Sequence, residues 1–104
     1  MLDWYEPLYI GKHVEKKLEK YRQKLNKGKL TPNIYLITFP VGQADQLEII
    51  NSFYLLQNAL YRRCPKIVGI AKGYDEACEL VLQIVEETIS HTGTANIKEY
   101  LMQR

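Results

Sequence analysis

Hydrophobic residues recur along this chain in two patterns, short apolar runs and longer stretches with helical spacing. The runs are 34–39 and 66–71, and each is followed by a glycine and then by an aspartate that can cap a helix. Apolar runs that alternate with amphipathic stretches are typical of strands joined by crossover helices. The pattern therefore predicts an α/β fold. Apolar residues on both faces of the 34–39 run indicate a strand buried between helices.

Four stretches carry the signals of helices. The first, 10–27, places five apolar side chains on one face: Ile10, Val14, Leu18, Tyr21 and Leu25. The second, 45–62, begins with an Asp-Gln-Leu-Glu capping box, and the third begins at Asp75 and ends at Gly93. Another capping box, which starts at Asn96, predicts a short helix within 96–104. The chain then divides into an aromatic segment 1–9, a helix 10–27, a βαβα core 34–93 and the final helix, in the order α-β-α-β-α-α.

The two strands, joined by a helix, are expected to lie parallel, with both glycine loops at one edge of the sheet. Two strands alone make a marginal sheet, and the apolar face of the 45–62 helix is wider than such a sheet can cover. We therefore expect a homodimer in which a second copy completes the sheet. The expected interface comprises Ile49, Phe53, Leu56 and Leu60, together with Trp4 and Tyr5 unless the aromatic segment is instead a lid packed on its own domain.

Composition adds limits to this picture. The chain has 104 residues, of which 46% are hydrophobic and 25% charged, as expected for one globular domain. No apolar run approaches the roughly 18 residues of a membrane span, and the first residues lack the features of a signal peptide, so we expect a cytoplasmic protein. The expected positions of Cys64 and Cys78 favour two free thiols over a disulfide or a zinc site.

The glycine loops are the candidate ligand site. Ligands of open α/β sheets bind where parallel strands end and helices begin, because backbone N–H groups face outward there. The residues expected at this edge are Gly42, Gln43, Lys72, Gly73 and Tyr74, and the amine of Lys72 would pair with a phosphate or a carboxylate. Against this interpretation, the loops match neither the dinucleotide-binding nor the P-loop fingerprint, and a single glycine before a helix is usually a turn residue.

Charge is unevenly distributed. Residues 1–31 contain eight Lys or Arg and four Asp or Glu, whereas residues 32–104 contain six and eight. A basic ridge is expected on the 10–27 helix, formed by Lys12, Lys16, Lys20 and Lys27. Such a ridge can neutralise phosphates of a nucleic acid, but no recognition motif accompanies it, and a solvated charged face explains it better.

No pattern in the sequence indicates a catalytic triad, a metal site or a cofactor. We therefore expect a non-enzymatic homodimeric interaction or regulatory protein that needs no cofactor. One alternative is a binding protein or an enzyme that takes a small anionic metabolite or nucleotide at the strand edge. A second alternative is a weak nucleic-acid binder that uses the basic ridge.

Overall fold

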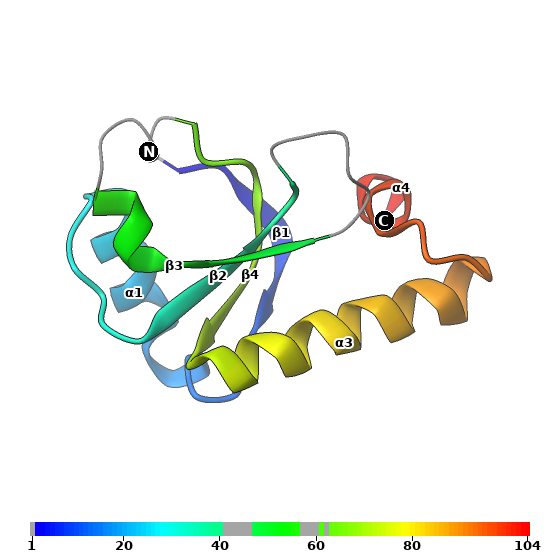
Figure 1. The fold of residues 1–104 in the computed structure, drawn as a ribbon, viewed down its shortest axis with the longest axis horizontal. Helices are drawn as coiled ribbons and strands as arrows, with labels where there is room; N and C mark the ends of the chain where they lie inside the picture. Colours follow the sequence, from blue (N-terminus) through cyan, green and yellow to red (C-terminus); the bar gives the residue numbers. More distant parts are fainter. Residues whose placement is uncertain (1, 41–46, 57–60, 62) are drawn as a thin grey trace.

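The computed structural model describes residues 2–40, 47–56, 61 and 63–104 as a mixed α/β protein (Figure 1). Two 3₁₀ helices, η1 (Glu15–Lys17) and η2 (Ser52–Leu56), accompany the regular elements. These are the strands β1 (Trp4–Ile10), β2 (Ile34–Thr38), β3 (Glu48–Asn51) and β4 (Ile67–Lys72), and the helices α1 (Leu18–Asn26), α3 (Tyr74–Thr92) and α4 (Ile97–Gln103). None of the described helices is long and apolar enough to cross a membrane.

The sheet is four-stranded and mixed, with the strand order β1-β4-β2-β3. Strand β4 runs parallel to β1 and antiparallel to β2, and β2 pairs antiparallel with β3 on its other side. The prediction that 34–39 and 66–71 form a parallel pair is therefore wrong. The α/β class and the positions of these two strands are confirmed.

The parallel pairing was expected because residues 45–62 were predicted to form the crossover helix between the two strands. Part of this stretch is instead a strand. Glu48–Asn51 forms β3, which pairs with β2 so that Ile49 lies opposite Ile37, and a 3₁₀ turn follows. Ile49 packs in the hydrophobic cluster on one face of the sheet and Ile50 in the cluster on the other. Two residues of the expected apolar face, Ile49 and Ile50, thus lie on opposite faces of a strand. Of the expected helix, residues 45, 46, 57–60 and 62 lie outside the described part of the chain.

The aromatic N-terminal segment is also a strand. Trp4–Ile10 pairs with β4 at the edge of the sheet, where a proline is tolerated because one side of the strand needs no ladder hydrogen bonds. Tyr5 and Tyr9 are buried, and the Tyr5 hydroxyl donates to the carbonyl of Leu101 in α4 over 2.8 Å. The segment therefore belongs to the core, and the two additional strands remove one reason for expecting a second copy to complete the sheet.

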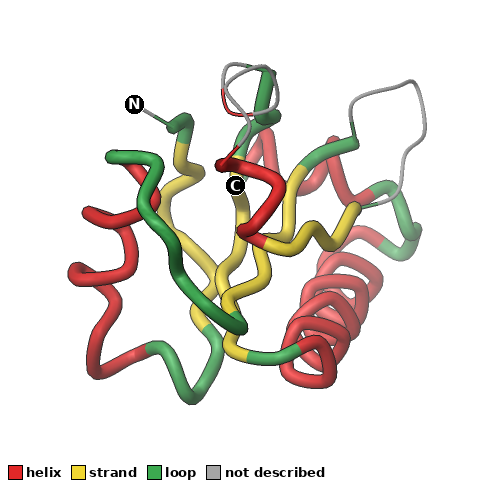
Figure 2. Tube along the Cα trace, turned by 60° about the vertical axis from the view of Figure 1, so that its left-hand side comes forward, coloured by secondary structure: helices red, strands yellow, loops and turns green. Residues whose placement is uncertain are grey.

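Helices cover both faces of this sheet (Figures 1 and 2). On one side α3 and α4 pack over a cluster that includes Tyr5, Ile37 and Ile84, and on the other α1 packs over a cluster that includes Leu25, Leu36 and Ile70. The expected helix over 10–27 is only partly confirmed, because its α-helical portion is 18–26. All five residues of its apolar stripe nevertheless lie in the second cluster.

The two C-terminal helices agree with the sequence. Gly93 ends α3 with a left-handed φ of 75°, which a residue without a Cβ adopts readily. Asn96 caps α4, since its side-chain oxygen accepts the backbone N–H of Glu99 at 3.2 Å. Arg104 then stacks over Tyr9 and donates to its hydroxyl over 2.5 Å, which ties the end of α4 to β1.

Candidate functional site

The candidate site lies where the parallel strands β1 and β4 end. The backbone N–H of Gly11 donates to the carbonyl of Ile70 over 2.7 Å, so the chain leaves both strands at the same place. There, Lys12 and His13 face the loop of Lys72 and Gly73 that leads into α3. The rule that ligands bind at the carboxyl ends of parallel strands applies here, but the partner of β4 is β1.

The second expected loop does not contribute to this edge. Ile34, the first residue of β2, pairs with Lys72, and Thr38 at the other end of β2 pairs with Ile67. The carboxyl ends of β2 and β4 therefore lie at opposite ends of the sheet, and the expectation of a shared edge is wrong. Gly42 and Gln43 themselves lie outside the described residues.

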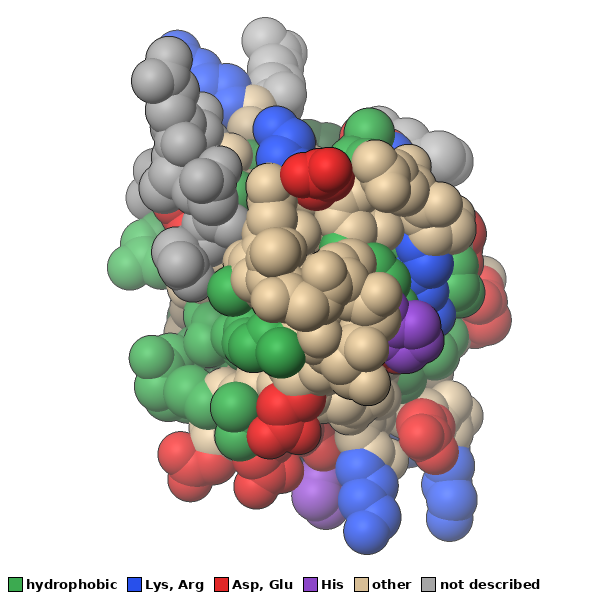
Figure 3. Space-filling view, turned by 90° about the vertical axis from the view of Figure 1, so that its right-hand side faces the viewer, with side chains coloured by type: hydrophobic (Ala, Val, Ile, Leu, Met, Phe, Trp, Pro, Cys, Tyr) green, Lys and Arg blue, Asp and Glu red, His purple; other side chains and the backbone are tan. Residues whose placement is uncertain are grey.

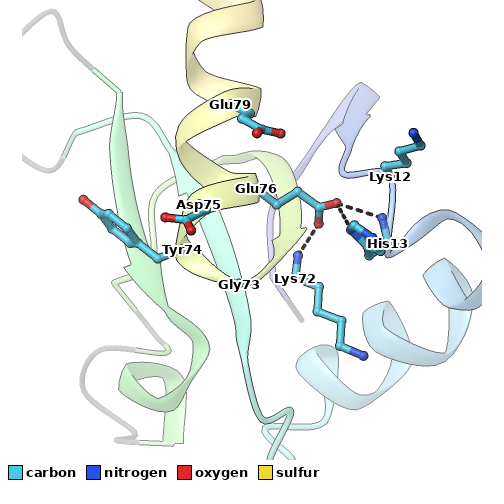
Figure 4. A pocket seen from close by; sticks show the side chains of 8 residues that line it. All are labelled: Lys12, His13, Lys72, Gly73, Tyr74, Asp75, Glu76 and Glu79. Carbon is cyan, nitrogen blue, oxygen red and sulfur yellow. Dashed lines mark hydrogen bonds and ion pairs between the residues drawn. The ribbon is translucent and has the colours of Figure 1, made fainter.

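Glu76, in the first turn of α3, connects the two loops (Figure 4). Its Oε2 accepts the backbone N–H of Lys72 at 2.6 Å, and its Oε1 accepts the backbone N–H of His13 at 2.8 Å. The Nδ1 atom of His13 lies 2.7 Å from the same Oε1. Only 11% of the Glu76 side chain is exposed, against 73% of that of His13. The carboxylate therefore uses the backbone donors of Lys72 and His13, so that neither is free to bind an external anion.

These contacts also set the charge of Glu76. Burial opposes ionisation and would raise the pKa of the carboxyl group. The backbone N–H groups of Lys72 and His13, together with the His13 ring, outweigh burial, and the net effect is a lowered pKa. Glu76 is thus held as a carboxylate at neutral pH.

Gly11 makes this close approach feasible. A Cβ at position 11 would lie 2.5 Å from Oε2 of Glu76 and 3.0 Å from the Cα of Ala71. A side chain here would displace the Glu76 carboxylate and crowd the backbone of Ala71. Gly73 has a different role, because its φ of 87° turns the chain into α3 while its N–H donates to the carbonyl of Asn33 over 2.8 Å.

Next to this contact lies a pocket of about 490 Å³, which we call the basic pocket. The segment after β1, the start of α1 and the end of β4 supply its lining residues: Lys12, His13, Glu15, Lys16, Lys17, Tyr21 and Lys72. Figure 4 shows the Lys72 side chain extending away from Glu76 towards α1. Four lysines thus face one carboxylate, that of Glu15.

The basic pocket combines residues from two separate sequence predictions. Lys72 was expected at a ligand edge, and Lys12 and Lys16 on a basic ridge. The ridge itself is not formed on one helix, because its four lysines lie in the turn after β1, in η1, in α1 and at the C-cap of α1. Lys20 and Lys27 do not line the basic pocket.

A second pocket of about 430 Å³ adjoins the basic pocket and has a different charge. It shares Lys12, His13 and Lys72 but adds the acidic residues Asp75, Glu76 and Glu79. Tyr74 lies on this side, 56% exposed, with its ring edge-on to that of Tyr35. Charged side chains of both signs accordingly gather at the lower end of the molecule in Figure 3.

The expected interface residues are scattered. Phe53 is 48% exposed, and Ile49 is half-buried in the sheet. Tyr5 is buried, and Trp4 is half-buried, with its indole N–H donating to Asn26 over 2.9 Å. Leu60 and the side chain of Leu56 lie outside the described part of the structure. Tyr5 is therefore packed inside its own domain, whereas Trp4 is partly buried against the cluster on the α1 side.

Sequence reasoning missed Gly11, His13, Lys17, Tyr21 and Glu76 as members of this site. One signal was present, since the apolar Leu8–Ile10 is followed by a glycine and a lysine, and β4 likewise ends in a lysine, Lys72, that is followed by Gly73. Both cysteines are free. Within the described residues no group of three or more His, Cys, Asp or Glu side chains could hold a metal ion.

Comparison of the chain with protein-family models, with curated proteins and with solved structures finds no match.

Proposed function

We propose that this protein binds a small polyanion, such as a phosphorylated metabolite, in the basic pocket. The observation that supports the proposal is the convergence of four lysines from three segments on one concavity with a single carboxylate. Its volume of about 490 Å³ suits a small ligand, because ligand pockets commonly measure about 300–1,000 Å³.

A ligand with several negative charges fits better than one with a single charge. The lysines are exposed, so each contact with an anion is screened by water and salt and is individually weak. Like charges held close together also repel, and a polyanion relieves that repulsion at several lysines at once. The backbone donors nearby are already used by Glu76, so the lysine side chains must provide the attraction.

Thermal unfolding with inorganic triphosphate tests the proposal. We expect the ligand to raise the unfolding midpoint, because a ligand at 100 times its Kd stabilises a protein by about 2.7 kcal/mol. The increase should be strongly reduced in Lys72→Ala and retained in Lys27→Ala, which removes the same charge outside the pocket. Raising salt from about 50 to 200 mM should weaken the effect. An absent shift, or equal losses in the two variants, would contradict the proposal.

Nucleic-acid binding through the ridge is an alternative proposal. Lys27→Ala tests it, because Lys27 belongs to the ridge and does not line the basic pocket. Of the ridge lysines, Lys20 and Lys27 belong to α1 and its C-cap, whereas Lys16 lies in η1 and Lys12 in the turn after β1, which weakens the case for one continuous phosphate-binding face. We expect binding to DNA or RNA no tighter than the nonspecific range of about 10⁻⁴ to 10⁻⁶ M at physiological salt.

Homodimerisation is the second candidate function, now for a different reason. Strand β3 pairs with β2 and with no other described strand, so it lies at the edge of the described sheet. Phe53 and Tyr54 follow it and are 48% and 55% exposed. Edge strands next to exposed aromatic residues are suited to pairing with another chain. Light scattering after size-exclusion chromatography checks this, and a monomer at micromolar concentration would argue against it.

A further inference from the structure

An apolar pocket lies at the opposite end of the sheet from the basic pocket. Its volume is about 400 Å³, and we call it the Thr38 pocket. Thr38, the last residue of β2, is one of its lining residues, and the others come from β3, η2 and the segment before β4: Glu48, Ile50, Tyr54, Leu55, Arg63, Cys64 and Pro65. Ile50 and Leu55 pack on the α1 side of the sheet, which places the pocket on that side.

The hydroxyl of Thr38 is the unusual feature of this pocket. Thr38 is fully buried, and its Oγ1 has no hydrogen-bond partner among the described residues. Leaving a buried hydroxyl unpaired is unfavourable, and such groups are rare in folded proteins. The other buried hydroxyls are paired: Thr31 donates to Ser52 over 2.8 Å, and Thr88 donates to the carbonyl of Ile84 over 2.8 Å.

The walls indicate what kind of group would satisfy this hydroxyl. Arg63 and Glu48 carry opposite charges, so the pocket does not favour a ligand of either sign. Burial, reinforced by the charge of Asp3, raises the pKa of the Cys64 thiol, so that this thiol is uncharged at neutral pH. The remaining lining is apolar apart from the hydroxyl of Tyr54.

We propose that the Thr38 pocket binds a small uncharged apolar molecule with one hydroxyl or carbonyl group, which pairs with the hydroxyl of Thr38. The apolar body of the ligand lies against Ile50, Leu55 and Pro65, where its removal from water supplies most of the affinity. The polar group selects among apolar ligands, because only a molecule that carries it satisfies Thr38.

The matched probes 1-naphthol and naphthalene test this inference, with binding followed by chemical-shift changes in the full-length protein. We expect 1-naphthol to bind roughly tenfold more tightly than naphthalene, a difference of about 1.4 kcal/mol. In Thr38→Val the hydroxyl is replaced by a methyl group of similar size, so this preference should disappear while naphthalene binds as before.

Thr31→Val is the control, because it removes a buried hydroxyl that is already paired. It should lower the unfolding midpoint and leave the preference for 1-naphthol intact, whereas Thr38→Val should keep or raise the midpoint. Equal affinities of the wild type for the two probes, or an unchanged preference in Thr38→Val, would overturn the proposal. Failure of both probes to bind would also overturn it, and together with a dimeric mass this would identify a second copy as the occupant.

Discussion

Replacing Glu76 by alanine is expected to lower the free energy of unfolding by about 2 kcal/mol. The carboxylate accepts two backbone N–H groups and contacts the His13 ring, and hydrogen bonds to a charged group contribute about 1.5–3 kcal/mol each when water does not replace them. Water reaches His13 and Lys72, which are exposed, so the loss is smaller than the sum. For a domain of this size the unfolding midpoint should fall by roughly 10 °C.

The matched control is Glu79→Ala, one turn further along α3. Glu79 is exposed and lines the same neighbouring pocket, so its replacement should change stability by less than about 0.5 kcal/mol. Equal effects of the two substitutions would show that stability is lost because a negative charge is removed from α3, and not because the contact between the loops is broken.

The Glu76 contact also predicts how stability depends on pH. Because the folded-state pKa is lowered, the contribution is fully present above the ordinary value of 4.5 and is lost as the pH falls through the lowered pKa. The difference in stability between the wild type and Glu76→Gln should therefore be constant near neutral pH and shrink in acid. Denaturant unfolding at several pH values measures it, and a difference that persists undiminished in acid would contradict the assignment.

Gly11→Ala is expected to have a similar effect on stability, about 2 kcal/mol, for a steric reason. The added Cβ would lie 2.5 Å from Oε2 of Glu76 and 3.0 Å from the backbone of Ala71, and overpacking of this kind commonly costs about 1–3 kcal/mol. The carboxylate can swing away, but the Ala71 backbone lies in a buried strand and has little freedom to move. Chemical denaturation measures the loss.

Two variants separate this clash from a general effect of replacing glycine. Gly28→Ala places a Cβ in open space at a φ of 69°. The only expected loss of stability there is the cost of a left-handed backbone for alanine, about 1 kcal/mol. In the double variant Gly11→Ala, Glu76→Ala the loss of unfolding free energy should be smaller than the sum of the two single losses, because the carboxylate that clashes is already absent. Full additivity would indicate that the Cβ disturbs the strand alone.

The sequence allowed the elements with strong local signals to be predicted. Strands β2 and β4 are unbroken apolar runs, α3 has a regular stripe ended by Gly93, and α4 has a capping residue whose side chain makes the expected hydrogen bond. In each case the residues that carry the signal lie within the element or directly beside it in the sequence, so no information on tertiary contacts is needed.

The errors arose where tertiary packing decides the structure. β3 has isoleucines at successive positions because both faces of the strand are covered, and this removes the alternation that distinguishes a strand from a helix. β1 contains exposed Glu6 and Pro7, which are poor strand residues but acceptable at a sheet edge. These two strands determine the direction of pairing, so the topology could not follow from the remaining elements.

The candidate site was predicted in pieces for the same reason. Lys72 follows from the loop after β4, and Lys12 and Lys16 follow from the basic segment, but they meet only because β1 pairs with β4. The Thr38 pocket gave no sequence signal, since a threonine in a strand is ordinary. Its distinguishing property, an unpaired hydroxyl, exists only in the folded protein.

The parallel pairing of β1 with β4 also determines when the basic pocket can form during folding. The β2–β3 hairpin joins Thr38 to Glu48 and closes a short loop, whereas β1 joins the sheet only when Ile10 reaches Ile70. Closing a longer loop costs more chain entropy, and contacts distant in sequence tend to form later. Because Lys12 and Lys16 follow β1 and Lys72 ends β4, the basic pocket depends on the most distant strand pairing of this sheet. Anion binding at the basic pocket would therefore report on a completely assembled sheet rather than on a partly folded chain.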